Sequence, residues 1–238
     1  MTHGGWTDSA AAWITQQGEQ GDQARRYILD PAMHARLSAR SFHRALDVGC
    51  GEGRFCRQMA ELGISVTGID PVASLIQHAT NKDPNGQYQI ASAEQLPFAD
   101  NTFDLVISYL TLIDIPDFRR AIGEMSRVLE PGGTLLIANL TPHNSAGMRA
   151  GWQKDTTGQP IHFGIDDYSN EWAEWVEWAN IKVQNWHRPL SAYMQAFLSC
   201  NLELRFYDEP MAASDYVDEH HMHARAPWFN VMEWQLSQ

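Results

Sequence analysis

Between residues 44 and 140, short apolar runs alternate with stretches in which apolar residues recur at helical spacing. This alternation is typical of a parallel α/β sheet, in which amphipathic helices join buried strands. The apolar runs predict five strands: RALDV (44–48), ISVTGI (64–69), QYQIA (87–91), DLVISY (104–109) and TLLIANL (134–140). Five strands and four crossovers within about a hundred residues favour a doubly wound sheet.

The same pattern predicts the helices that join these strands. Apolar spacing indicates helices over about 55–62, 72–80 and 118–129, and Gly63 is placed to end the first of them. The last ends before Pro131-Gly132, a pair that suits a type II turn.

The flanking segments have another character. Residues 1–43 look helical, whereas 141–190 look irregular and aromatic, and seven of the nine tryptophans lie beyond residue 150. A helix is expected from Pro189 to Cys200, followed by strands at 203–207 and 228–234. We therefore expect one α/β domain over 1–238 with a doubly wound, seven-stranded, mostly parallel sheet. Its four segments are 1–43, 44–140, 141–190 and 191–238.

Composition narrows the class of protein. The chain has 238 residues, 44% of them hydrophobic, and 17 Lys and Arg against 29 Asp and Glu, a net charge of −12. Because negative charge repels phosphate backbones and anionic lipid, a general nucleic-acid or membrane binder is disfavoured. Three scattered cysteines make no disulfide framework. We see no secretory signal in MTHGGWTDSA and no apolar run of membrane-spanning length, so we expect a cytoplasmic protein.

The most informative segment is ALDVGCGEG (45–53), a strand that opens into a glycine-rich turn. Such a turn brings backbone N–H groups and bare Cα atoms against a ligand. Asp47 precedes the first glycine by two residues, and Arg54 stands where a dinucleotide fingerprint has its third glycine. A carboxylate at this place repels a pyrophosphate but suits an ammonium or sulfonium. The alternative is a tight turn with a solvated Asp.

Asp70 ends the second strand, 21 residues after Gly49. A carboxylate at about this spacing is placed to accept hydrogen bonds from both ribose hydroxyls. The alternative is an N-cap of the following helix, and one carboxylate could fill both roles. An adenosine ligand with a positive centre is S-adenosylmethionine (SAM).

These motifs resemble those of the class I SAM-dependent methyltransferases, and within them the type 11 family, which mostly modifies small molecules. The matching segments are LDVGCGEG (46–53), GID (68–70), ASAEQLPFADNTFDLVIS (91–108), RVLEPGGTLLI (127–137) and NWHRPLSAYMQAF (185–197). The resemblance implies a Rossmann-like methyltransferase fold with SAM as cofactor. Residues 1–43 would be a lid, 44–140 the SAM-binding core, 141–190 an insertion facing the methyl acceptor, and 191–238 a helix with strands six and seven.

The resemblance also implies which residues contact the cofactor. The implied set is Asp47, Gly49 and Gly51 at the amino acid part, Asp70 at the ribose, Pro71, Ser92, Ala93 and Glu94 around the adenine, and Ser108 near the methionine backbone. Many relatives have Asp at the position of Ser92, and serine would bond the adenine amino group more weakly. Arg26 and Tyr27 could reach the methionine carboxylate or cover the cofactor. Surface charge and a core tyrosine are the alternative reading of that pair.

Methyl transfer from a sulfonium is an in-line displacement on carbon, so the protein mainly has to hold acceptor and methyl together. Proximity of that kind lowers a barrier by roughly 7–11 kcal/mol. A general base is needed only for an acceptor whose proton must leave. The candidates are His187 in the NWHRP segment, Tyr109 and Asp114 after strand four, and His143 after strand five. A structural role, such as a His187 that orients Arg188, stays open for each of them.

Two further patterns have plain alternatives. Trp172, Trp175 and Trp178 recur every third residue between glutamates, which suits an aromatic wall or cage, but an amphipathic face packed on the sheet is favoured. The run 219–223 holds three histidines without orienting partners, so a solvated segment is favoured and no metal site is expected.

The leading hypothesis is methyl transfer to O, N or C of a small-molecule acceptor. One alternative is an enzyme that uses the SAM site for decarboxylation or cyclisation, or holds SAM as a structural ligand. Another is a SAM-responsive regulatory subunit. A nucleic-acid or protein acceptor is disfavoured because the chain has no basic tract and no Asn-Pro-Pro-Tyr-type motif after strand four. The acceptor's identity and the oligomeric state do not follow from the sequence.

Overall fold

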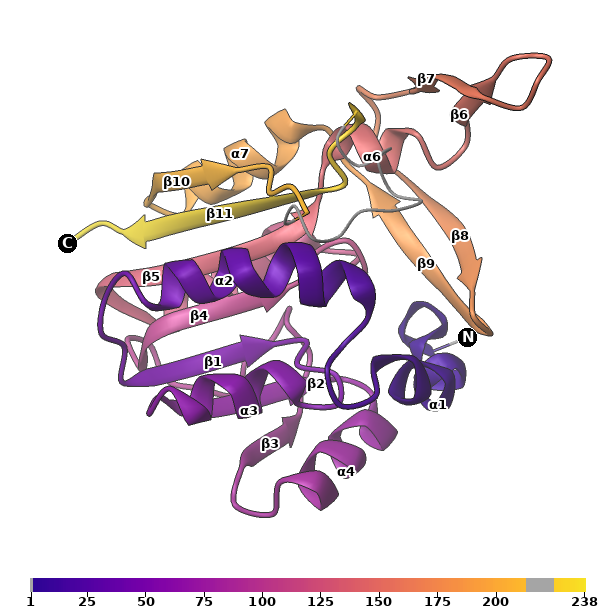
Figure 1. The fold of residues 1–238 in the computed structure, drawn as a ribbon. Helices are drawn as coiled ribbons and strands as arrows, with labels where there is room; N and C mark the ends of the chain where they lie inside the picture. The colour runs from indigo at the N-terminus through magenta and orange to yellow at the C-terminus, as the bar shows by residue number, and fades with distance from the viewer. Residues whose placement is uncertain (1, 213–224) are drawn as a thin grey trace.

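The computed structural model describes residues 2–212 and 225–238, and a seven-stranded sheet forms its centre (Figure 1). The strand order is β10-β11-β5-β4-β1-β2-β3. The strands are β1 (Arg44–Val48), β2 (Ser65–Asp70), β3 (Gln87–Ile90), β4 (Phe103–Tyr109), β5 (Leu129–Leu140), β10 (Leu202–Asp208) and β11 (Phe229–Leu236). Neighbours from β3 to β5 are parallel, whereas β11 is antiparallel to both β5 and β10. The predicted doubly wound, mostly parallel sheet is confirmed.

Strand β5 begins earlier than the sequence predicts. Leu129 pairs with Phe103 ahead of a register irregularity, so the pairing starts before the expected turn. Gly132 has φ 79°, the left-handed conformation that a type II turn requires. The turn is therefore present but lies inside the extended strand.

Helices cover both faces of the sheet (Figure 1). On one face, α2 (Asp30–Leu37) and α3 (Arg54–Glu61) pack on β1, β4 and β5. On the other, α5 (Phe118–Val128) and α7 (Leu190–Ser199) pack on the same strands. Helix α4 (Ala73–Lys82) lies beside β2 and β3.

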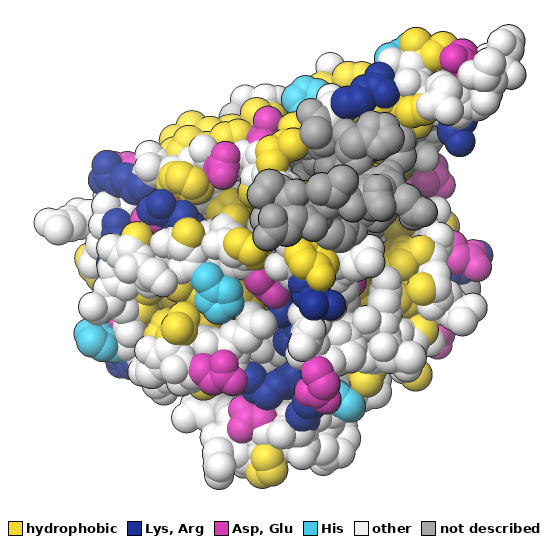
Figure 2. All heavy atoms as spheres, viewed as in Figure 1, with side chains coloured by type: hydrophobic (Ala, Val, Ile, Leu, Met, Phe, Trp, Pro, Cys, Tyr) yellow, Lys and Arg dark blue, Asp and Glu magenta, His cyan; other side chains and the backbone are white. Residues whose placement is uncertain are grey.

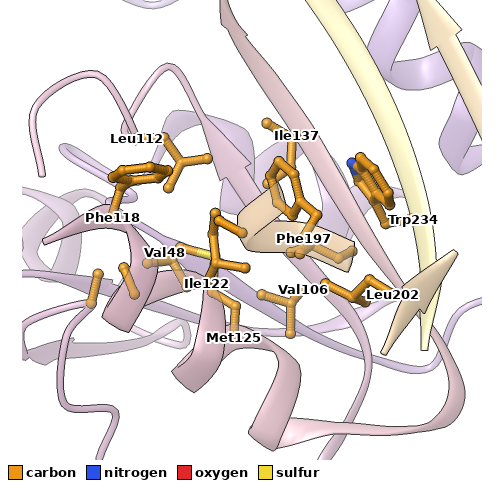
Figure 3. Packing of buried hydrophobic residues seen from close by; sticks show 14 of the residues in the cluster. Val48, Val106, Leu112, Phe118, Ile122, Met125, Ile137, Phe197, Leu202 and Trp234 are labelled. Carbon is orange, nitrogen blue, oxygen red and sulfur yellow. The ribbon is translucent and has the colours of Figure 1, made fainter. Parts of the chain in front are cut away.

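The larger buried cluster lies under α5 and α7 (Figure 3). Met125 of α5 and Phe197 of α7 are fully buried, together with Val106 of β4. Phe197 stacks on Trp234 of β11 with ring centroids 4.7 Å apart. Burying each of these large side chains contributes about 1.5–3 kcal/mol, which fixes the strands that carry the site.

The segment expected to be irregular contains regular structure. It comprises α6 (Pro142–Ala146), a hairpin of β6 (Gly151–Lys154) with β7 (Pro160–Gly164), and a hairpin of β8 (Trp172–Trp178) with β9 (Ile181–His187). Ala179 and Asn180 join β8 to β9 with φ 45° and 64°, the left-handed pair of a type I′ turn. A two-residue turn of this type fixes the register of the second hairpin.

The amphipathic face packed on the sheet, which the tryptophan spacing favoured, is therefore wrong. In strand β8, alternate residues face opposite sides, so Trp172 and Trp178 share one side while Trp175 lies on the other. The hairpin forms its own two-stranded sheet and does not add a helical face to the central sheet. A period of three cannot build a continuous aromatic wall on a strand.

The predicted N-terminal helical segment is confirmed. It contains η1 (Thr2–Gly5), α1 (Trp6–Gln17), the π-helical turn η2 (Arg25–Leu29) and α2. Helix α1 lies along the β8–β9 hairpin (Figure 1). Ser9 Oγ donates to the Lys182 carbonyl and accepts from the Lys182 N–H at 3.1 and 3.0 Å. Trp178 Nε1 donates to Gln16 Oε1 at 2.9 Å. These contacts, which we call the α1–hairpin seam, join the beginning of the chain to its insertion.

Acidic, basic and apolar side chains are interspersed on the face shown in Figure 2. Among the described residues, none of the helices combines the length and apolar character that crossing a membrane requires. The expected cytoplasmic location stays a prediction.

Candidate functional site

A large cavity lies at the carboxyl ends of β1, β2 and β4, where a doubly wound sheet binds its ligands. Its volume is about 1150 Å³. This volume lies just above the range of about 300–1,000 Å³ that ligand pockets commonly span. The loops after the three strands form its floor, and α1, η2 and the β8–β9 hairpin contribute to its cover.

The glycine turn borders this cavity. Gly49, Gly51 and Gly53 have φ 79°, 57° and 79°, a left-handed conformation that side chains other than glycine adopt at a cost. A Cβ on Gly49 would lie 2.2 Å from Thr111 Cγ2, whereas a Cβ on Gly51 would approach the Trp13 indole nitrogen at 3.4 Å. Gly49 is thus required by the close approach of the loop after β4, and Gly51 keeps the turn open toward α1.

That loop carries backbone strain of its own. Leu110, the first residue after β4, has φ 56°. A non-glycine residue in this region costs of order 1–3 kcal/mol, and such residues cluster at functional sites. The turn at Leu110 brings Thr111 against the Gly49 carbonyl, with Oγ1 3.4 Å from that oxygen.

Asp47 is buried beneath the glycine turn, with 1% of its surface exposed. Its Oδ2 accepts a hydrogen bond from Cys56 Sγ at 3.3 Å, and its Oδ1 has no partner among the described residues. Burial, together with the neighbouring Asp70 and Glu52 carboxylates, raises the pKa of Asp47 to about 7. A buried carboxylate with a free oxygen is a place where a cationic group would be stabilised.

Asp70 lines the cavity at the end of β2 and is 7% exposed. Its Oδ1 accepts from the Val72 N–H at 2.8 Å and its Oδ2 from the Gly51 N–H at 3.1 Å. Burial raises the pKa of Asp70 to about 6 despite these bonds. The N-cap of α4 is Val72, so the alternative role of Asp70 as a helix cap is wrong. Each oxygen keeps a lone pair for a hydroxyl.

The other expected cofactor residues fall into two groups. Pro71, Ser92, Ala93 and Glu94 line the cavity beside Asp70. Ser92 Oγ bonds to the Glu94 carboxylate and accepts from the Glu94 N–H at 3.2 Å, so that hydroxyl is engaged within its own loop. Ser108 is fully buried and does not line the cavity, although its Oγ has no partner among the described residues.

The lid contributes a second arginine, Arg25, besides the expected Arg26. Arg26 lines the cavity and lies over the Tyr27 ring at 5.1 Å, while Tyr27 is not part of the lining. Arg25 also lines the cavity and lies 4.7 Å from the centroid of the Trp13 ring. Its guanidinium bonds to Asp22 at 2.5 Å. Sequence spacing gives no signal for Arg25, because its position depends on the π-helical turn.

A buried network ties the lid to the glycine turn. Arg54 donates to both oxygens of Asp30 at 2.7 and 3.0 Å, and Tyr109 donates to Asp30 Oδ1 at 2.9 Å. Arg54, Asp30 and Tyr109 are 5%, 8% and 7% exposed. Burial raises the pKa of Tyr109 well above its ordinary value, and the Asp30 charge adds to this. Tyr109 lines the cavity, but its hydroxyl is committed to the network.

The two histidines proposed for chemistry lie outside the cavity. His187 is fully buried; its Nδ1 faces Ser145 Oγ at 2.7 Å and its Nε2 faces the Tyr168 carbonyl at 2.8 Å. Because a carbonyl only accepts, Nε2 carries the proton and Nδ1 accepts from Ser145. Burial also lowers the pKa of His187. These contacts are those of a histidine with a structural role, and they do not support the expectation that His187 is a general base. His143 borders a smaller pocket beside the β6–β7 hairpin.

Other cavity residues come from segments far apart in the sequence. Trp6 and Trp13 belong to α1, and Asn185 belongs to β9. Asp114, which the sequence places after strand four, meets Asn185 in the cavity wall. No local pattern identifies Trp6 or Asn185, since the approach of α1 to β9 brings them to the site.

Among the described residues, no group of three or more His, Cys, Asp or Glu is arranged to hold a metal ion. The histidine run at 219–223 lies outside the described residues.

Comparisons with known proteins agree with this geometry. Residues 46–137 match a family model described as a methyltransferase domain. The chain is 34% identical over 135 residues to a malonyl-[acyl-carrier protein] O-methyltransferase of Enterobacter lignolyticus, covering 57% of this chain and 53% of the relative. It is 41% identical over 135 residues to the O-methyltransferase resE of Aspergillus sclerotiorum, covering 54% and 51%. The chain thus spans about half the length of these curated relatives.

The fold has a match over nearly its whole length. The crystal structure of an S-adenosylmethionine-dependent methyltransferase from Mesorhizobium loti superposes with a TM-score of 0.79 and 26% identity. The match covers 89% of this chain and 97% of that one.

Proposed function

Because residues 46–137 form a methyltransferase domain, we propose that the whole chain is a SAM-dependent methyltransferase that acts on a small molecule. The observation that carries this proposal is the pair of buried carboxylates at the glycine turn. Asp47 and Asp70 face one cavity, and burial raises the pKa of both. A ligand that brings a positive charge between them stabilises their ionised forms.

The residues present fit this cofactor. Asp47 has a buried oxygen without a partner, the bare Cα of Gly51 leaves the turn open, and Asp70 keeps free lone pairs. Asp47 and the glycine turn would hold the amino acid part, and Asp70 the ribose. Pro71, Ala93 and Glu94 line the wall at which the adenine would lie. Arg26 at the rim would face the methionine carboxylate.

SAM, when bound, supplies a methyl group on a positively charged sulfur. The chain itself orients and encloses the reactants. The Asp30–Arg54–Tyr109 network fixes the lid against the glycine turn, and the α1–hairpin seam holds α1 against the hairpin that covers part of the cavity. In such an enclosure, positioning alone lowers the barrier by roughly 7–11 kcal/mol.

The relatives named above support a small-molecule acceptor, and the net charge of −12 argues against a nucleic-acid acceptor. Beyond residues 46–137, the β8–β9 hairpin lines the cavity and would face that acceptor.

The test is a calorimetric titration of the purified protein with SAM, NAD and ATP, followed by transfer of labelled methyl to a metabolite library. We expect SAM alone to bind, and one S-adenosylhomocysteine to form for each methyl transferred. Binding of NAD or ATP in place of SAM would overturn the proposal. SAM consumption without a methylated product would point to another reaction, and binding without turnover to a regulatory subunit.

A further inference from the structure

One part of the cavity wall lies between the lid and the insertion, apart from the glycine turn. It is formed by Asp114 from the loop after β4, Trp6 from α1 and Asn185 from β9, all of which line the cavity. Asn185 Nδ2 donates to Asp114 Oδ1 at 2.6 Å, and the Trp6 side chain also donates to the Asp114 carboxyl. We call these three residues the Asp114 centre. Both of its donors are neutral, so they orient the carboxyl without cancelling its charge.

The arginines that line this cavity are not paired with Asp114. Arg25 is paired with Asp22, and Arg54 with Asp30. Arg26 is exposed and lies over the Tyr27 ring. Among the described residues, none of these arginines is paired with Asp114, so its carboxylate, once ionised, would have no cationic partner until a ligand supplies one. An anionic acceptor would be repelled from this wall, whereas a hydrogen-bond donor would be attracted to it.

We propose that Asp114 binds the methyl acceptor through an O–H or N–H group and takes the proton which that group loses. The acceptor is then an alcohol, a phenol or an amine, and not a carboxylate. This inference rests on the proposed methyl transfer and adds the acceptor class to it.

The step balances as follows. The X–H bond of the acceptor breaks and its proton passes to a carboxylate oxygen of Asp114. The electron pair left on X forms the bond to the methyl carbon, while the pair of the broken C–S bond stays on sulfur. The carboxylate and the sulfonium charges are both neutralised, which is favourable where burial disfavours the ionised carboxylate.

The pKa of Asp114 suits its proposed role as a base. Burial raises its pKa to about 8, the hydrogen bonds from Trp6 and Asn185 oppose the rise, and the facing charges are Asp70, which raises the pKa, and Arg25, which lowers it. A base is most effective when its pKa is near the working pH. A bound sulfonium would further favour the ionised carboxylate.

The test uses a fragment library with equal numbers of phenols and alcohols, amines, and carboxylic acids. Binding to the protein saturated with S-adenosylhomocysteine is followed by ligand-observed NMR, and the hits are titrated by calorimetry. We expect the hits to be O–H and N–H donors. Asp114→Asn should weaken their binding about ten-fold or more, since the substitution removes a charged acceptor. The same donors should receive labelled methyl with a rate that rises with pH and levels off at or below about pH 8, in the unaltered protein only.

The control is Asp117→Asn, three residues further along the loop. Asp117 is exposed and caps α5 by accepting from the Arg120 N–H at 3.1 Å, a role that asparagine fulfils equally well. Asp117→Asn should leave the affinities of the fragment hits unchanged. Asp114→Ser serves as a second variant if Asp114→Asn does not fold, as judged by circular dichroism.

Three results would overturn the inference: hits that are mainly carboxylic acids, donors that bind both Asp114 variants normally, or no donor binding at all. If Asp114→Asn weakened SAM instead of the fragments, Asp114 would face the cofactor, and the inference would also be wrong. Failure of the proposed function is distinct, because the unaltered protein would then not bind SAM by calorimetry.

Discussion

Replacing Asp70 with asparagine should distinguish the effect of its buried charge on protein stability from its effect on SAM binding. The carboxylate accepts hydrogen bonds from Val72 and Gly51, and burial raises its pKa from 3.8 to about 6. A difference of roughly two pH units corresponds to about 3 kcal/mol by which ionised Asp70 destabilises the unliganded protein at pH 7. Asparagine removes this cost but turns its NH₂ toward a backbone N–H, which costs about 1–3 kcal/mol.

We therefore expect Asp70→Asn to change the unfolding free energy of the unliganded protein by no more than about 2 kcal/mol at pH 7. SAM affinity should fall at least ten-fold, because a hydrogen bond to a charged group contributes about 1.5–3 kcal/mol and 1.4 kcal/mol is a factor of ten. The assays are calorimetric titration with SAM and thermal unfolding without it.

The pH dependence gives an independent check. Because the folded-state pKa of Asp70 is raised, the unfolded chain ionises first, and this residue's contribution to stability falls as pH rises from 3.8 to about 6. The stability of Asp70→Asn relative to the unaltered protein should thus increase from pH 4 to pH 7. Asp100→Asn, which alters an exposed carboxylate paired with Arg127, is the control. SAM affinity within two-fold of the unaltered protein, or a relative stability that decreases with pH, would refute the reasoning.

Two other variants test the surroundings of the site. Arg54→Leu leaves the Asp30 charge buried without its partner and should lower the unfolding free energy by about 3–5 kcal/mol in urea, and adding Asp30→Asn should recover part of it. An unchanged urea midpoint for Arg54→Leu would contradict this. His187→Asn should cost about 1–3 kcal/mol of stability, since it disrupts buried hydrogen bonds, but should keep SAM affinity and turnover per folded molecule. Normal folding and SAM binding with turnover abolished would instead place His187 in the chemistry.

The central sheet could be predicted because its signals are local. Most of the predicted strands are apolar runs, and all seven are present; β5 begins five residues earlier than expected, and the other six lie within two residues of the expected bounds. The positions of Asp47 and Asp70 at strand ends also follow from local sequence, since parallel strands end at one edge of the sheet.

The cover of the cavity could not be predicted in the same way. The β8–β9 hairpin has a two-residue Ala179-Asn180 turn, which lacks the glycine that usually marks a type I′ turn. The Asp114 centre joins residues from three segments, and its hydrogen bond between Asp114 and Asn185 spans 71 positions. The environment of His187 depends on Ser145 and Tyr168, which no spacing rule brings together. Tertiary contacts decide these features.

The α1–hairpin seam has a consequence for the order in which the molecule assembles. The hydrogen bonds between Ser9 and Lys182 join positions 173 residues apart. Contacts between such distant positions form slowly, because the chain must first lose the entropy of closing the intervening loop. The intervening residues include five strands of the central sheet, and their folding shortens this loop. We therefore expect the enclosure of the cavity to follow the folding of these five strands, so a nascent chain would acquire this scaffold before its binding chamber.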